Sequence, residues 1–184
     1  MNRSLILAVF VVATSGCQTV HIDIQSAKPA IAQRLHLSAD QIMYARHVNW
    51  TLVTHYAGRP LERGLLQADF GSAIYVQTQS ALYVLPPKLD ADAAPLVTLD
   101  LSKISGVAIQ STTTWLTREH MEQLQIVSGK DMLALICDDR FDQIGGGKAE
   151  TEATYQHLLN AGLHAGAANP YVIRKIHARV PVGI

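Results

Sequence analysis

Residues 123–137 read QLQIVSGKDMLALIC, and this stretch decides the fold class. Two apolar-rich segments flank Ser128-Gly129-Lys130-Asp131, a sequence typical of the turn of a β-hairpin. The second arm, residues 132–137, is apolar on both faces, which predicts a central strand that is covered on both sides. The stretch therefore predicts an antiparallel sheet.

Segments before this hairpin also predict strands, because they are rich in β-branched, aromatic and other apolar residues. They cover residues 65–70, 73–76, 81–85, 96–101 and 106–115. Gly71-Ser72 predicts a break between the first two, and residues 77–80 predict a hairpin turn. The sheet is thus expected to fill most of the middle of the chain.

A helix is expected after the hairpin. A loop containing three glycines, 145–147, leads into residues 148–163, where Tyr155, Leu158 and Leu159 form one apolar stripe. Gly166 is a plausible end for this helix, and residues 171–180 predict a last strand. Antiparallel strands followed by one amphipathic helix indicate the α+β class.

The region before the sheet allows two interpretations. Ser38-Ala39-Asp40-Gln41 resembles a capping box, and apolar residues at helical spacing follow it. Residues 45–55 also alternate as a strand would, and Thr51, Val53 and Thr54 favour a strand for the second half.

Residues 64–163 resemble a pleckstrin-homology-like or GRAM-like bacterial module. The resemblance depends on the order of the elements and on Ile104-Ser105-Gly106-Val107, where one strand passes into the next. It implies a bent antiparallel sheet with a helix that plugs one end. The strands expected at 45–55 and 171–180 are additions to that pattern.

The amino terminus predicts export. Arg3 precedes an apolar run at 5–13, which is much shorter than the roughly 20 residues of a membrane-spanning helix. Thr14-Ser15-Gly16-Cys17 resembles the lipobox of bacterial lipoproteins, although Thr14 stands where that family most often has Leu. The resemblance implies cleavage before Cys17, acyl chains such as palmitate on Cys17, and, with Gln18 next, the periplasmic face of the outer membrane.

These features divide the chain into a signal peptide at 1–16, a lipidated tether at 17–37 and a single α+β domain at 38–184. Of the 184 residues, 168 remain after cleavage, with 14 basic and 15 acidic side chains. This balance argues against a nucleic-acid partner, which needs a basic footprint. Cys137 has no cysteine partner once Cys17 carries lipid, so we expect a buried, reduced thiol.

No catalytic, cofactor or metal site is expected. The loop before Lys148 lacks the Walker pattern, since Asp142 and Ala149 occupy two of its required positions. The eight histidines do not pair at metal spacing. Cys137 lies in an apolar strand before two aspartates, which disfavours a thiolate.

The most suggestive surface is the last strand, where an aromatic residue and four basic residues gather: Tyr171, Arg174, Lys175, His177 and Arg179. Such a surface suits lipid headgroups or an acidic protein partner. Positive residues also protect edge strands from unwanted pairing, and the sequence does not separate these roles. We therefore expect a non-catalytic interaction module of the cell envelope with an envelope protein as partner. The alternatives are a small-ligand or lipid carrier and, with least support, a hydrolytic enzyme.

Overall fold

The structure is a computed structural model that describes residues 24–53, 68–87, 94–113, 120–137 and 148–168. The predicted lipidation site Cys17 and the predicted final strand 171–180 lie outside these ranges.

The described residues form two α-helices, two 3₁₀ turns and seven strands. In chain order they are α1 (Ile24–Arg34), η1 (Ala39–Gln41), β1 (Tyr44–Val53), β2 (Ala68–Gln77), β3 (Ala81–Leu85), β4 (Val97–Asp100), η2 (Leu101–Lys103), β5 (Ile104–Thr113), β6 (His120–Ser128), β7 (Asp131–Cys137) and α2 (Lys148–Asn160).

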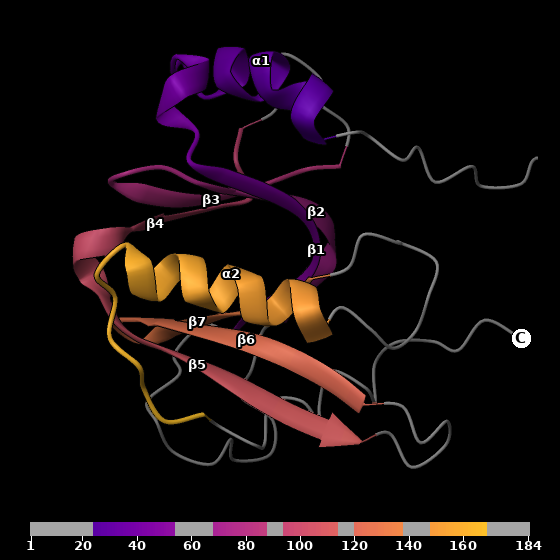
Figure 1. Ribbon diagram of the computed structural model, residues 1–184, viewed down its shortest axis with the longest axis vertical. Coiled ribbons are helices and arrows are strands. Elements are labelled where there is room, and N and C mark those ends of the chain that lie inside the picture. Colours follow the sequence, from indigo (N-terminus) through magenta and orange to yellow (C-terminus); the bar gives the residue numbers. More distant parts are fainter. Residues whose placement is uncertain (1–23, 54–67, 88–93, 114–119, 138–147, 169–184) are drawn as a thin grey trace, which may run out of the picture.

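The strands make one sheet in the order β4-β3-β2-β1-β7-β6-β5, and every neighbouring pair is antiparallel. The sheet is bent, and α2 lies across the opening between its two halves (Figure 1). This arrangement confirms the predicted α+β class and the hairpin at 123–137, whose arms are β6 and β7.

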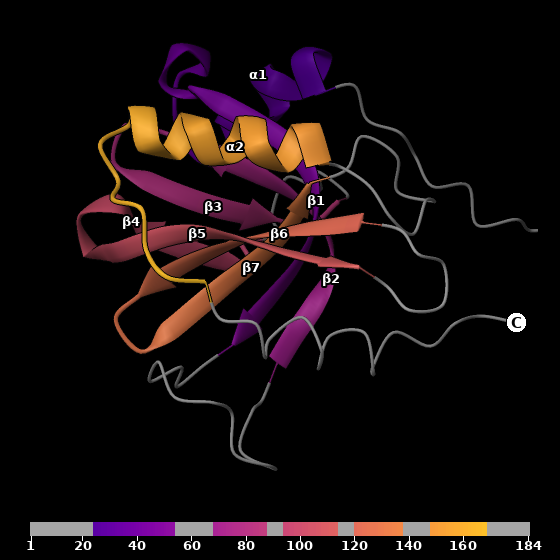
Figure 2. The ribbon, with the colours of Figure 1, turned by 60° about the horizontal axis from the view of Figure 1, so that its bottom comes forward.

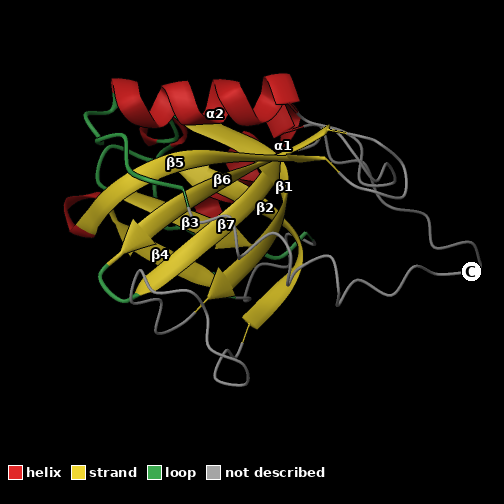
Figure 3. Cartoon of the chain, turned by 90° about the horizontal axis from the view of Figure 1, so that it is seen from below, coloured by secondary structure: helices red, strands yellow, loops and turns green. Residues whose placement is uncertain are grey.

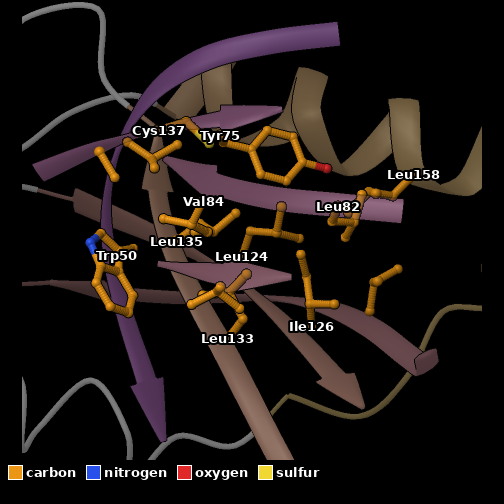
Figure 4. Packing of buried hydrophobic residues seen from close by; sticks show 14 residues of the cluster. Trp50, Tyr75, Leu82, Val84, Leu124, Ile126, Leu133, Leu135, Cys137 and Leu158 are labelled. Atoms are coloured by element: carbon orange, nitrogen blue, oxygen red, sulfur yellow. The ribbon is translucent and has the colours of Figure 1, made fainter. Parts of the chain in front are cut away.

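The inner face of the bent sheet encloses the main core. Fourteen buried residues meet there: thirteen come from the seven strands, each of which contributes at least one, and Leu158 comes from α2 (Figure 4). Alternate positions of β1 supply Val48 and Trp50, as the period of two in a strand requires. β7 is buried at most positions, as expected of a strand covered on both sides.

A second, smaller core lies on the outer face of β1, β2 and β3, under α1. Ile31 and Ala32 of the helix pack with Ile74, Val76 and Leu85 of the strands. In Figure 1, α1 lies on the opposite side of these strands from α2. The tether predicted for 17–37 is thus wrong from Ile24 onward, because α1 buries apolar side chains against the sheet.

Two local expectations are also corrected, and one ambiguity is resolved. Gly71-Ser72 is no break, because both residues pair with β1 inside a continuous β2. The last helix ends at Asn160 and not at Gly166. Gly162, two residues later, has a φ of +90°, which suits the left-handed position after a helix. Residues 44–53 are a strand, since β2 and β7 supply pairing partners on both sides.

Candidate interaction site

The structure does not test the predicted site residues. Cys17 lies outside the described residues, as do the five residues of the predicted interaction surface, Tyr171, Arg174, Lys175, His177 and Arg179. Within the described ranges, polar and aromatic side chains gather where α2 crosses β1 and β7. We call this group, Tyr44, Arg46, Cys137, Thr154 and His157, the α2 seam.

Thr154 is the centre of the α2 seam. Its hydroxyl donates to the main-chain oxygen of Glu150 at 2.8 Å, one helical turn earlier. Because a hydroxyl has one proton, its oxygen acts as acceptor for the Cys137 thiol at 3.3 Å and for the Tyr44 hydroxyl at 3.1 Å. Thr154 thereby joins α2 to both β7 and β1.

Cys137 is held as a neutral thiol. It is fully buried, with 0% of its surface exposed, and it forms no disulfide. Burial raises the pKa of the thiol above its ordinary value, although the hydrogen bonds to Thr154 and Thr151 oppose that shift. A thiol that is both inaccessible and protonated is a poor nucleophile, and the predicted buried, unpaired Cys137 is confirmed.

The outer part of the α2 seam is aromatic and cationic. The rings of Tyr44 and His157 stack at 4.1 Å with 30° between their planes. The Arg46 guanidinium carbon lies 5.7 Å from the centre of the Tyr44 ring, within the range of a cation–π contact. Desolvation raises the pKa of Tyr44, so this surface carries a neutral phenol beside the Arg46 cation. It suits contact with planar or anionic groups.

The sequence predicts that two of the three residues of this surface lie together, but it does not predict the third. Tyr44 and Arg46 are two residues apart in a strand, so they share a face. His157 is 111 positions beyond Arg46, and nothing in the local pattern places its ring on Tyr44. The fold alone brings them together.

A buried carboxylate ties the start of α2 to β6. Glu122 is 6% exposed, and its Oε1 lies 3.5 Å from Lys148 Nζ and accepts a hydrogen bond from Ser111 at 3.3 Å. The Lys148 side chain is 75% exposed, so solvent screens the ion pair. Lys148, the lysine after the predicted glycine loop, is therefore engaged in an intramolecular contact.

Among the described residues, no three His, Cys, Asp or Glu side chains are grouped to hold a metal ion. A cysteine-dependent enzyme requires a histidine beside an accessible cysteine. Here Cys137 is fully buried, and the His157 ring stacks on Tyr44. No helix in the described ranges has both the length and the apolar character to cross a membrane.

Comparisons with known proteins concern the fold. No protein-family model matches the sequence. No curated protein sequence matches it.

Solved structures of pleckstrin homology domains are similar to it. The Slm1-PH domain in complex with phosphoserine has 12% identity and a TM-score of 0.39, over 65% of this chain and 93% of that chain. The pleckstrin homology domain of ArhGAP27 has 12% identity and a TM-score of 0.36, over 64% of this chain and 98% of that one.

A structure from a systematic screen for protein–lipid interactions in Saccharomyces cerevisiae has 10% identity and a TM-score of 0.36, over 64% of this chain and 92% of that chain. The strand order and the final helix of the chain itself give it the pleckstrin-homology-like arrangement: a bent antiparallel sheet of seven strands followed by one helix.

Proposed function

We propose that the chain is a lipid-anchored, non-catalytic interaction module of the bacterial cell envelope, held at the periplasmic face of the outer membrane through Cys17. In this proposal the basic residues Arg174, Lys175, His177 and Arg179, with Tyr171, contact an acidic envelope protein or lipid headgroups.

One observation supports a surface role above the alternatives. The described fold uses its reactive groups internally: the Cys137 thiol and the Tyr44 hydroxyl bond to Thr154, and Glu122 bonds to Ser111 and Lys148. Side chains of the main core occupy the space inside the bent sheet, where a carrier holds its ligand (Figure 4). For the described part of the chain, these contacts favour a function carried by the outside of the domain.

The anchor is tested by Cys17→Ser in the full chain. We expect this variant to incorporate no radiolabelled fatty acid and to leave the lipoprotein-processing route, while its circular dichroism spectrum stays that of the folded domain. Cys137→Ser is the matched control and should keep the label. Label on Cys17→Ser would show that lipid is attached elsewhere or that the signal is misassigned.

The interaction surface is tested by reversing its charge. We expect Arg174→Glu, Lys175→Glu and Arg179→Glu together to remove the proteins that cross-link to and co-purify with the detergent-solubilised lipoprotein, because attraction to an acidic surface becomes repulsion. Lys103→Glu with Lys130→Glu, at two exposed positions of the described surface, is the matched control. Retention of the same partners by the triple variant would remove residues 171–180 from the interface.

A further inference from the structure

The two ends of α2 contact the sheet in different ways. Among the described residues, the side chains that α2 and the turn after it contribute to the main core all come from position 155 onward. They are Leu158, which is fully buried, and Tyr155, Leu159 and Leu163, which are partly buried. The buried residues of α2 before position 155 are two threonines, Thr151 and Thr154. Residues 148–154, the amino-terminal half of α2, are therefore held by polar contacts, and the rest of the helix is held by apolar ones.

The polar contacts of the amino-terminal half are few. Thr151 Oγ1 accepts a hydrogen bond from the Cys137 N–H at 3.3 Å, which is longer than the roughly 2.7–3.2 Å usual for such a bond. Thr154 Oγ1 accepts from the Cys137 thiol at 3.3 Å and from the Tyr44 hydroxyl at 3.1 Å. Two threonine hydroxyls thus carry the contacts of this half with β7 and β1.

An unsatisfied carboxylate oxygen lies beside the start of α2. The Glu122 Oε2 atom is buried and has no hydrogen-bond partner in the part of the chain that the structure describes. The other oxygen, Oε1, lies 3.5 Å from Nζ of Lys148, a side chain that is 75% exposed. A buried carboxylate oxygen without a partner destabilises the closed arrangement, and an opening at this end lets water reach it. Glu122 therefore makes detachment of the amino-terminal half less costly.

The carboxyl end of α2 has a second attachment, which the segment after the helix provides. Val107 N–H donates to the His164 oxygen at 2.9 Å, and Gly166 N–H donates to the Val107 oxygen at 2.7 Å. These bonds form a parallel bridge between Val107 and Ala165. The two backbones are so close that a methyl group on Gly106 would lie 3.4 Å from Gly166 Cα. Figure 2 shows this segment running from the carboxyl end of α2 down past β5.

We propose that α2 is a gate with its hinge near Leu158: residues 148–154 detach from the sheet while Leu158 and the segment 164–166 stay packed. Figure 3 shows α2 lying along one side of the strands, so its first two turns can leave without displacing a strand. Their departure uncovers the Cys137 thiol and the Tyr44 hydroxyl. The gate thereby controls access to the inner face of β7 and β1. This inference does not depend on the anchor at Cys17.

The Cys137 thiol reports the opening, because it is 0% exposed and bonds to the amino-terminal half of α2. In the full chain carrying Cys17→Ser it is the only thiol. We expect it to react with DTNB at a rate that stays constant over the lowest urea concentrations, at least about tenfold above the rate that global unfolding allows, because a local opening exposes little surface. A rate that follows the global unfolding equilibrium at every urea concentration would overturn the proposal.

Two substitutions in the Cys17→Ser chain locate the hinge. Thr151→Val leaves the Cys137 N–H without its acceptor in the closed form only, so the rate without urea should rise at least about fivefold. Leu158→Ala is the matched control in the carboxyl-terminal half. It should lower the stability of the whole domain but change the urea-independent rate by less than about twofold, since Leu158 stays packed when the gate opens. Equal acceleration by both variants, or none by Thr151→Val, would refute the hinge.

Hydrogen exchange measured by NMR keeps the proposal testable if either variant does not fold. The amides of residues 152–155 bond to the first turn of α2, and those of 158–161 bond to the last turns. After correction for intrinsic rates, the first group should exchange at least about tenfold faster than the second. Equal protection of the two groups, or faster exchange at 158–161, would contradict an opening from the amino end.

Discussion

Thr154 joins three elements through one oxygen atom. It accepts from Cys137 and Tyr44 and donates within α2, so removal of its hydroxyl leaves two buried or half-buried donors without an acceptor. We expect Thr154→Val to lower the free energy of unfolding by about 1–3 kcal/mol, the usual cost of unsatisfied buried groups. Urea unfolding followed by circular dichroism measures the change.

Thr154→Ser is the matched control, since it keeps the hydroxyl and loses only a methyl group. It should stay closer to the wild-type stability than Thr154→Val does. If both variants are equally destabilised, the methyl group and not the hydrogen bonds holds α2 in place.

The Cys137 thiol predicts a loss of stability at alkaline pH. Its folded pKa is raised by burial, whereas the unfolded thiol titrates near about 8.5. From about pH 8.5 upward the unfolded chain therefore loses this proton first, and the free energy of unfolding falls by up to about 1.4 kcal/mol per pH unit. Below about pH 8.5 the thiol is protonated in both states, so its full contribution to the free energy of unfolding is present.

Urea unfolding of Cys17→Ser between pH 7 and 9.5 measures this effect, because Cys137 is then the only thiol in the chain. Adding Cys137→Ala should flatten the curve in this window. If the free energy of unfolding of the Cys137→Ala variant still falls with pH in this window, the effect comes from another titratable group.

At the scale of single residues, the sequence predicts the buried thiol but not its neighbours. Two features of the sequence are enough to infer a buried, unpaired Cys137: it lies in an apolar strand, and Cys17, the other cysteine, is expected to carry lipid. Thr154, which accepts from the thiol, is 17 positions after it, and Tyr44, which bonds to the same Thr154 oxygen, is 93 positions before it. Their meeting depends on how α2 crosses the sheet. The stack of Tyr44 on His157 has the same origin.

At the scale of elements, α1 is the main addition to what the sequence predicts. The sequence predicts a tether here because Lys28-Pro29 interrupts short apolar pairs and proline disfavours the interior of a helix. In the structure, Pro29 nevertheless lies inside α1. What stabilises the helix is its contact with β2 and β3, which no local pattern contains. The break expected at Gly71-Ser72 fails for a similar reason, because pairing with β1 overrides local preference.

This account predicts that α1 contributes to folding. Ile31 is fully buried, so Ile31→Ala should lower the free energy of unfolding by about 2–5 kcal/mol, the range for loss of a large core side chain. Gln33→Ala, at an exposed position of the same helix, should change it by less than about 0.5 kcal/mol. Thermal or urea unfolding of both variants measures the difference, and equal stability would return α1 to the role of a tether.

At the scale of the whole molecule, the fold class follows from local patterns because each strand has its own turn signals. The hairpin at 123–137, the strand at 81–85 and the helix from Lys148 onward all lie where the sequence predicts them. The strand order comes from pairings between distant segments, and α1 packs on the outer face of β2 and β3 although it precedes them by some forty residues or more. Those non-local features determine which surfaces are left for partners.

The start of α1 at Ile24 would limit where a molecule anchored through Cys17 could act. Six residues separate Ile24 from Cys17, and a fully extended chain of that length reaches about 20–25 Å. If Cys17 carries the proposed lipid, this short connection would keep the domain close to the membrane surface. Its partners would then be proteins and headgroups that meet it there, and its search for them would be two-dimensional.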